Sequence, residues 1–317
     1  MLRALIVGSG WGRYAGEAFG DDPRVELCGI VGRGSPRTSQ LAAQLGVPVF
    51  DSLNVALSAI RPEIAAVAVA EGENEAIAER LILAGAHVLC SHPVAPDAPA
   101  VQRMGALAEK HGRLIATDYT LRLSPAFVAA RNALSLAGPV LRSSVRCPGR
   151  ALVMGIDLAL AFGGPAAQVY AAGRYPASLA ERRREMPAAF PPLCILEHHG
   201  GAVTTIMPAP HALPAFAHRI EISALSARID VALPAGGASE FRNLGGGRVV
   251  ERELWSPAAA PSSQEIFGSG MRSLVHRFVD SVVEGIPVHA PLVEEYQVRA
   301  TWAALRRSSI EERPAVV

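Results

Sequence analysis

The chain has 317 residues, half of them hydrophobic, which is enough to bury a large core and favours two domains over one. Its formal net charge of +1 argues against the clustered basic face of a nucleic-acid-binding protein. No apolar run approaches the ~20 residues of a membrane span. The N-terminus also lacks the charged, apolar and cleavage regions of a signal peptide, so we expect a cytoplasmic protein that does not associate with membranes.

The first predicted element is the apolar run Leu2–Val7, which is typical of a buried parallel strand. The turn that follows consists of Gly8, Ser9, Gly10, Trp11 and Gly12. Glycines here allow a tight turn and let backbone N–H groups approach a phosphate, and a helix over 13–19 would direct its positive end at a pyrophosphate. The spacing departs from the G-x-G-x-x-G fingerprint, because Arg13 occupies the sixth position. The alternative is a glycine-rich turn that binds nothing.

A second predicted strand, Val25–Val31, ends in a turn without a carboxylate. A fold that prefers NAD places an Asp or Glu there to accept from the ribose 2′-hydroxyl. This turn offers arginines and hydroxyls instead, which match the oxygens of a phosphate. The candidate phosphate-binding residues are Arg33, Gly34, Ser35, Arg37 and Thr38. We therefore predict NADPH/NADP as the cofactor, the alternative being a solvated basic loop before a helix over 39–45.

Strands and helices alternate through the rest of the N-terminal region. We expect strands at 64–70, 87–90 and 113–117 and helices at 74–84 and 98–111. This alternation predicts right-handed βαβ crossovers and a parallel sheet, in which the ligand lies outside the carboxyl ends of the strands. Residues at those predicted ends, which should line the same crevice as the Gly8 turn, are Ala70, His92, Pro93, Asp118 and Tyr119.

After Tyr119 the pattern changes to short strands joined by Gly-Gly and Pro-rich turns, which predicts a largely antiparallel sheet. We expect strands at 140–147, 167–175, 193–198, 202–207, 218–225, 227–233 and 248–255. Helices at 126–136 and 151–162 are available to cover one face of this sheet. Helices at 266–284 and 292–308 close the chain. The second half is therefore predicted to be an α+β domain whose sheet is open on one face.

Histidines are frequent in the second half, but their spacing argues against a metal site. His198 and His199 are adjacent in a predicted strand and so point to opposite faces of the sheet. Glu197, His211 and His218 complete the alternative, metal-binding interpretation. The four cysteines, which lack the paired spacing of zinc ligands, are Cys28, Cys90, Cys147 and Cys194. We therefore expect neither a metal nor a disulfide.

The order of these parts resembles the glucose–fructose oxidoreductase / inositol dehydrogenase (Gfo/Idh/MocA-like) superfamily over essentially the whole chain. The resemblance implies an N-terminal Rossmann domain with a parallel sheet over residues 1–118. It also implies a C-terminal substrate and dimerisation domain over residues 119–317. Members usually carry Glu-Lys-Pro after the strand at 87–90 and a helix with His three residues before Asp. Here the first motif reads Ser-His-Pro and Met154 stands three residues before Asp157, so both usual hydride-chemistry groups are absent.

The absence of these two groups resembles the pattern in the thiazolinyl imine reductases of siderophore and related nonribosomal peptide pathways. These enzymes carry His-Pro where relatives have Lys-Pro, as at His92 and Pro93, and a tyrosine at the next strand end, as at Tyr119. The stretch 149–158 also resembles theirs. The resemblance implies NADPH-dependent reduction of a thiazoline C=N bond to a thiazolidine. It favours Tyr119 as the proton donor, with His92 as a positioning group or alternative acid, while Asp157 orients substrate or packs between the domains.

The resemblance further implies a homodimer paired through the open sheet, and a carrier protein that presents the substrate. Carrier domains are usually acidic, and Arg182–Arg184 is the densest basic run in the chain. That run is either a docking surface or a solvated helix face. Two other functions stay open: a sugar or alcohol dehydrogenase of the wider superfamily, and a non-catalytic NADP(H)-binding regulator. The missing groups weaken the former and favour the latter.

Overall fold

The computed structural model describes residues 1–70, 72–173, 191–209, 217–234, 236–257 and 262–317. The chain divides into two compact units, one made of residues 1–120 and 267–296 and the other of residues 121–266 and 297–317. Each unit therefore combines two separate stretches of chain. A single division of the sequence after residue 118 does not anticipate that 267–296 lie with the N-terminal residues.

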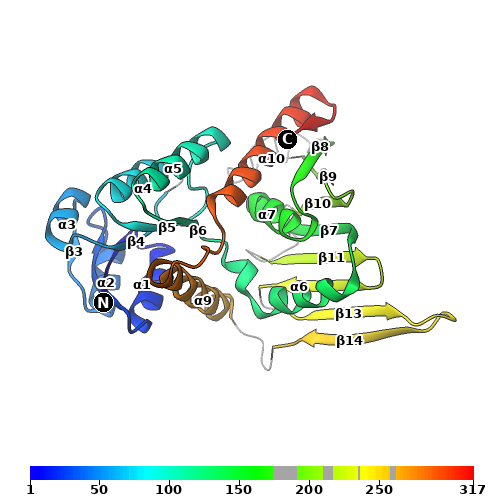
Figure 1. Cartoon of the computed structure of the whole chain (residues 1–317), viewed down its shortest axis with the longest axis horizontal. Coiled ribbons are helices and arrows are strands. Elements are labelled where there is room, and N and C mark those ends of the chain that lie inside the picture. The colour runs from blue at the N-terminus through cyan, green and yellow to red at the C-terminus, as the bar shows by residue number, and fades with distance from the viewer. Residues whose placement is uncertain (71, 174–190, 210–216, 235, 258–261) are drawn as a thin grey trace. The chain divides into compact units, whose positions relative to one another are not determined.

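The first unit contains a six-stranded sheet in the order β3-β2-β1-β4-β5-β6, with every neighbouring pair parallel (Figure 1). Its strands are β1 (Leu2–Val7), β2 (Val25–Val31), β3 (Val49–Phe50), β4 (Ile64–Val67), β5 (His87–Cys90) and β6 (Ile115–Thr117). The helices between them are α1 (Gly12–Asp21), α2 (Pro36–Leu45), α3 (Leu53–Ile60), α4 (Asn74–Leu83) and α5 (Ala98–Lys110). The predicted Rossmann sheet is confirmed, and its strand order reverses between β1 and β4, where such sheets bind ligands.

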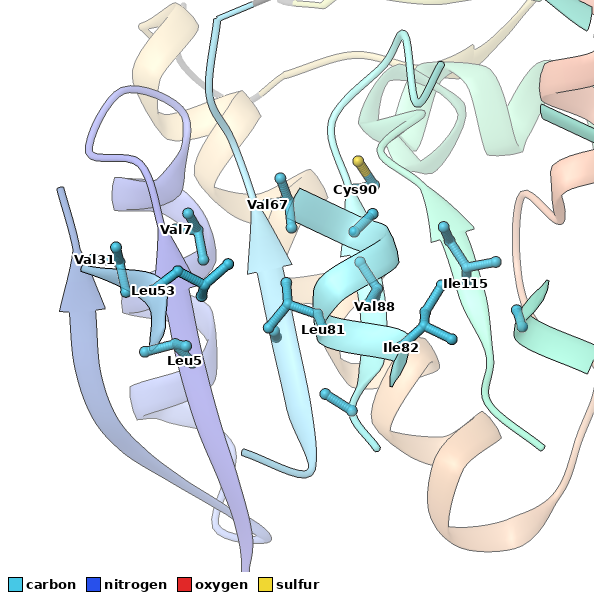
Figure 2. Close-up of a cluster of buried hydrophobic side chains, with 14 of the residues drawn as sticks. Leu5, Val7, Val31, Leu53, Val67, Leu81, Ile82, Val88, Cys90 and Ile115 are labelled. Carbon is cyan, nitrogen blue, oxygen red and sulfur yellow. The ribbon is translucent and has the colours of Figure 1, made fainter. Parts of the chain in front are cut away.

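The apolar runs that predict the strands form the core of this sheet. Leu5, Val67 and Val88 come from three neighbouring strands and are buried in one cluster. Leu81 and Ile82 of α4 belong to the same cluster (Figure 2). All four residues of β4 are buried, as expected for a strand with a helix on each face.

The first unit differs from the prediction at β3, at α3 and at the end of β4. β3 and α3 occupy residues 49–60, where no element was expected. β3 has only two residues and therefore carries no periodic signal. β4 ends at Val67, three residues before the predicted end at Ala70. Residues 68–70 are as apolar as the strand itself, so composition alone does not show where they leave the sheet.

Helix α9 (Ser263–Glu284) is joined to the N-terminal residues by a charged cluster. Asp22, which is 6% exposed, accepts two hydrogen bonds from the Arg24 guanidinium at 2.8 and 2.9 Å. Arg24 also donates to Asp280 of α9 at 2.6 Å, and His276 Nδ1 lies 3.2 Å from Asp22 Oδ2. The hydrogen bonds from Arg24 lower the pKa of Asp22 to about 2, because they stabilise its ionised form.

The segment after α9 continues along the edge strand β6. The N–H of Thr117 donates to the carbonyl of Ala290 at 3.1 Å, and Ala116 and Pro291 form an antiparallel bridge. Leu292, the first residue of α10 (Leu292–Glu311), packs against the buried cluster of Ala95, Ala100 and Val101. Backbone and apolar contacts therefore hold the first turn of α10 in this unit.

The second unit contains a nine-stranded sheet in the order β14-β13-β12-β11-β7-β10-β9-β8-β15 (Figure 1). Its strands are β7 (Val140–Pro148), β8 (Ala166–Ala172), β9 (Leu193–His198), β10 (Val203–Ala209), β11 (His218–Ala224), β12 (Arg228–Leu233), β13 (Ala238–Asn243), β14 (Val249–Trp255) and β15 (Ala315–Val316). Among the described residues only β7 and β10 pair in parallel, which confirms a mostly antiparallel sheet. β13, with the polar sequence ASEFRN, and the short β15 were not predicted.

Helices α6 (Pro125–Ala137) and α7 (Leu152–Gly163) lie on one face of this sheet (Figure 1). Gly155 of α7 approaches so closely that a Cβ on it would meet Cys147 Sγ at 2.9 Å. Alternate residues point the other way, and Arg146 and Arg219 there are exposed, so this face is open as far as the described chain shows. No helix within the described ranges is long and apolar enough to cross a membrane.

We expect Asp22→Asn to lower the free energy of unfolding at pH 6 by about 2 kcal/mol, the equivalent of the pKa shift. The native pKa of Asp22 is depressed from 3.8 to about 2, so its contribution is complete above about pH 4 and is lost as the pH falls toward 2. Urea denaturation should therefore show a smaller difference between variant and wild type at pH 3 than at pH 6.

Asp21→Asn is the matched control, because the side chain of Asp21 is 63% exposed and lies 3.9 Å from Arg272. We expect it to change stability by no more than about 0.5 kcal/mol. An Asp22→Asn difference that is the same at both pH values would contradict the assigned role of Asp22.

Candidate functional site

A cavity of about 440 Å³ lies at the carboxyl ends of β1, β2 and β4 in the first unit. The predicted site residues that line it are Gly8, Ser9, Gly10, Trp11, Arg33, Ser35, Thr38 and Ala70. Arg37 is exposed and, like Gly12 and Gly34, lies outside this lining. The sequence therefore predicts most of the cavity wall on the glycine side and on the side of the β2 turn.

The glycine turn is shaped by close contacts that only glycine permits. Gly8 has φ +98°, and a Cβ on it would meet the carbonyl oxygen of Ala68 at 2.1 Å. Gly10 differs, because a Cβ there would find no described atom within 4 Å. The turn is thus closed against β4 at Gly8 and open toward the cavity at Gly10, which leaves room for a phosphate beside its N–H groups.

The departure from the G-x-G-x-x-G spacing also has a structural reason. The third glycine of that fingerprint serves to bring the helix close to the strand. Gly12 has this role here, since a Cβ on it would lie 2.9 Å from Ile6 Cγ2 of β1. Arg13, at the sixth position, donates to the hydroxyl of Tyr14 at 2.8 Å and lies 4.6 Å from the centre of its ring. The early third glycine therefore retains the helix–strand contact.

A chain of hydroxyls links the glycine turn to the turn after β2. Thr38, which is 2% exposed, donates from Oγ1 to Ser9 Oγ at 3.1 Å and lies 3.0 Å from Ser35 Oγ. Ser35 caps the N-terminus of α2 by accepting from the N–H of Thr38. The positive end of α2 is therefore held at the cavity, where it favours an anion.

Two carboxylates, Asp51 and Glu73, also line the cavity. The prediction missed them because it considered only the turn after β2. Arg33 forms an ion pair with Glu73, which precedes α4, and Asp51 follows β3. These acidic residues come from neighbouring turns, so inspection of residues 32–38 alone cannot find them. Their positions could have indicated them, since Asp51 comes directly after a strand and Glu73 directly before a helix.

A second group of predicted residues meets at the ends of β5 and β6. The rings of His92 and Tyr119 stack with their centres 5.7 Å apart and their planes 29° from parallel. The turn at His92 is fixed by the buried Asn74, whose Nδ2 donates to the carbonyls of Ser91 and Pro93 at 3.1 and 2.9 Å. His92, Pro93 and Tyr119 are not among the residues that line the cavity, but they lie on the same sheet edge, beyond β4.

Two carboxyl groups lie at this end of the sheet, and one of them, Glu295, was not predicted. Glu295, in the first turn of α10, is fully buried and accepts from the hydroxyl of Tyr119. Asp118 follows β6 directly, and burial raises its pKa to about 6, with hydrogen bonds from Thr120 opposing the shift. Asp118 was recognised by its place at a strand end, but nothing in the local sequence distinguishes Glu295 from its neighbour Glu294.

Asp157, the third predicted catalytic residue, lies in the second unit. Its side chain is buried and forms an ion pair with Arg122, whose Nε donates to Asp157 Oδ2 at 3.1 Å. Arg122 belongs to a short 3-10 helix, Thr120–Leu123, and was not predicted. A buried carboxylate paired with a guanidinium is fixed in place, which suits a structural or orienting role.

His198 and His199, which were considered as metal ligands, have different surroundings in the structure. His198 is buried, with Nδ1 2.6 Å from the carbonyl of Gly164 and Nε2 2.8 Å from Thr204 Oγ1. His199 is exposed, and His211 lies outside the described residues. Within the part of the chain that the structure describes, no group of three or more His, Cys, Asp or Glu side chains could hold a metal ion.

Two glycine substitutions should separate folding from cofactor binding. Gly8→Ala meets backbone at 2.1 Å in a left-handed conformation, so we expect a loss of at least about 3 kcal/mol in the free energy of unfolding. Gly10→Ala meets nothing within 4 Å among described atoms and should change stability by less than about 0.5 kcal/mol.

Gly10→Ala should nevertheless raise the Kd of a nicotinamide dinucleotide about tenfold or more, because its Cβ would occupy the space beside the N–H groups and displace the phosphate by the equivalent of one hydrogen bond to a charged group. Trp11 lines the cavity, so quenching of tryptophan fluorescence can follow the titration. Unchanged affinity in a folded Gly10→Ala variant would show that the pyrophosphate does not bind at this turn.

A search of curated proteins finds no match to this chain. Solved structures with the same fold are found. Among solved structures, the chain is similar to GenD2 from gentamicin A biosynthesis in complex with NAD, with 22% identity, 100% of this chain and 96% of that chain covered, and a TM-score of 0.81. It is also similar to an oxidoreductase from Agrobacterium radiobacter in complex with NAD+, L-tartaric acid and magnesium, at 13% identity over 99% and 98% of the two chains, with a TM-score of 0.84.

A third similar structure is levoglucosan dehydrogenase in complex with NADH and levoglucosan, at 16% identity over 100% and 99% of the chains, with a TM-score of 0.84. At these identities the likeness shows the fold. Residues 2–119 match the model of the oxidoreductase family with an NAD-binding Rossmann fold, GFO_IDH_MocA. The glycine turn and its cavity lie in this matched stretch, so residues 2–119 are similar to the NAD-binding Rossmann domain of that oxidoreductase family.

Proposed function

We propose that the chain is a thiazolinyl imine reductase, an NADPH-dependent enzyme that reduces a thiazoline C=N bond to a thiazolidine. The observation that carries the proposal is the stacking of His92, which stands in the place of the Glu-Lys-Pro motif, on Tyr119 at the next strand end. Reduction of C=N needs a hydride at carbon and a proton at nitrogen. An imidazolium or a phenol can supply that proton, and neither requires the missing lysine.

The cofactor would be held by the glycine turn and the turn after β2. The N–H groups of residues 8–12 suit a pyrophosphate, and Arg33 with the N-terminus of α2 suits a 2′-phosphate. Bound NADPH supplies the hydride. The ion pair between Arg33 and Glu73 means that a 2′-phosphate competes with a carboxylate for the same guanidinium.

A sugar or alcohol dehydrogenase is the second candidate, and Asp118 is the observation that favours it. Oxidation of a hydroxyl needs a general base, and a carboxyl with a pKa of about 6 accepts a proton near neutral pH. The structural relative levoglucosan dehydrogenase is consistent with this alternative. A non-catalytic NADP(H)-binding regulator would bind the cofactor without turning over either class of substrate.

NADPH oxidation followed by absorbance tests the function, with a small-molecule thiazoline as substrate and a panel of polyols with NADP+ in parallel. We expect thiazoline-dependent oxidation of NADPH and no polyol oxidation. Turnover of polyols alone would establish the dehydrogenase, and cofactor binding without any turnover would establish the regulator.

We further propose that NADPH is preferred over NADH. Arg33→Ala should cost about 1–3 kcal/mol of that preference, the range for a hydrogen bond to a charged group. Arg37→Ala is the matched control, because Arg37 is exposed outside the cavity lining and should change the preference less. Titration of both cofactors against the wild type and the two variants measures this, and NADH binding as tightly as NADPH would overturn the assignment.

The partners proposed with this function are a second copy of the chain and the carrier protein of a nonribosomal peptide synthetase. The open face of the second sheet supports the homodimer, since Tyr170 and Ile195 on neighbouring strands form a half-buried apolar patch there. Small-angle scattering should give a dimer mass, and a monomer mass at every concentration would contradict it. The basic run Arg182–Arg184, predicted to receive the carrier, lies outside the described residues.

A further inference from the structure

A buried carboxylate from far along the chain lies beneath the two candidate proton donors. Glu295 is 0% exposed and lies 176 residues after Tyr119, whose hydroxyl donates to Glu295 Oε2. The N–H of Val94 donates to Glu295 Oε1 at 3.3 Å. Removing a carboxylate from water is unfavourable unless partners compensate, and here a hydroxyl and a backbone N–H donate to it.

These two contacts of Glu295 both lead to His92. Val94 follows the His92–Pro93 turn by one residue, so its N–H fixes the backbone on which His92 stands. Tyr119 stacks against the imidazole ring, so its position fixes the plane of that ring. Glu295 therefore supports the backbone that Asn74 also holds, and it holds the tyrosine ring against which the imidazole of His92 stacks.

The same geometry assigns different parts to the two candidate acids. Tyr119 is 3% exposed, and its hydroxyl proton is directed at the Glu295 carboxylate. His92 is only half-buried. To protonate a substrate, Tyr119 would have to break its hydrogen bond to a buried carboxylate, and the more exposed His92 is therefore the better placed of the two.

We propose that Glu295 is a positioning residue of this site, which holds the Tyr119 ring as a platform and the Val94 backbone as an anchor so that His92 delivers the proton. The delivery of a proton to a thiazoline nitrogen rests on the proposed function. The placement of His92 by Glu295 does not. This reverses the order of roles that the sequence resemblance implies for Tyr119 and His92.

Variants of Glu295 should still fold with this segment in place, because other contacts hold it. The N–H of Thr117 bonds to the carbonyl of Ala290, Pro291 bridges to Ala116, and Leu292 packs in an apolar cluster. None of these contacts involves the Glu295 side chain. The side chain can therefore be changed without removing the backbone that carries it.

The first experiment measures kcat and KM for the full-length protein with NADPH and a small-molecule thiazoline. Glu295→Leu should lower kcat about 10- to 100-fold, while the KM for NADPH changes by less than about twofold. Glu295→Gln should restore kcat to within about fivefold, since its carbonyl can accept from Val94 and its amide can bond to the Tyr119 oxygen. His92→Asn should lose about 100-fold or more, the usual contribution of a general acid.

A double-mutant cycle tests whether Glu295 acts through Tyr119. Tyr119→Phe retains the ring and should cost less than about tenfold in kcat, well below the loss for His92→Asn. The combination of Glu295→Leu with Tyr119→Phe should be no worse than Glu295→Leu alone, because the second change removes a contact already lost. Glu294→Gln, which neutralises the neighbouring carboxylate in the same helical turn, is the matched control and should behave as wild type.

The second experiment needs no turnover. In cofactor-free protein with ¹³C-labelled histidine, the Cε1–H signal of His92 can be identified by its loss in His92→Asn. Glu295→Leu should shift and broaden this signal, because the imidazole loses its fixed position against the Tyr119 ring. Glu295→Gln and Glu294→Gln should leave the signal near its wild-type position.

An unchanged His92 signal and kcat in Glu295→Leu would overturn the proposal. Losses in Glu295→Leu and Tyr119→Phe that multiply would also overturn it, as would a Tyr119→Phe loss greater than that of His92→Asn, which makes Tyr119 the donor. If the wild type fails to reduce any thiazoline, the proposed function is wrong, and the His92 signal still decides whether Glu295 positions the imidazole.

Discussion

The contact between Gly8 and the Ala68 carbonyl is the constraint on which the cofactor side of the molecule depends. Any side chain at Gly8 would overlap the backbone of the neighbouring strand end. That contact holds the turn after β1 against the end of β4. The N-terminus of α1 therefore lies at the cavity, where its N–H groups are available. The open space at Gly10 and the close packing of Gly12 on β1 then follow from the direction in which α1 leaves the turn. Gly8 therefore avoids a clash with the backbone, Gly10 leaves space at the cavity, and Gly12 lets α1 pack on β1.

The first unit is completed by residues that come much later in the chain. Arg24 connects the buried Asp22 to Asp280 of α9, at the end of the sheet where β2 begins. Backbone contacts of 290–291 with β6 extend the sheet edge, and Glu295 then lies under the turn that carries His92. The residues proposed for catalysis are therefore supported by a segment that belongs to the C-terminal part of the sequence. A carboxylate there is compensated only because the tertiary fold brings a hydroxyl and a backbone N–H to it.

The two faces of the sheet in the second unit differ in how far their side chains are buried. Cys147 and Ile206 face α7, while Arg146, one position before Cys147, is exposed on the opposite face. The buried pair of Arg122 and Asp157 adds a fixed charge pair to this unit, where a lost partner would leave an uncompensated charge. Asp157 therefore differs from His92, which is half-buried beside a tyrosine ring.

The sequence by itself determined the parallel sheet, the antiparallel second sheet and the glycine side of the cavity, because each rests on local periodicity and on turn chemistry between neighbours in the chain. It also placed His92 and Tyr119 together, since the carboxyl ends of adjacent parallel strands meet at one edge. Asp51, Glu73, Arg122 and Glu295 were decided only by the tertiary structure. Their significance depends on which distant groups compensate or compete for their charge. Burial and ion pairing are properties of the packed chain, and no local pattern around an Asp, Glu or Arg specifies them.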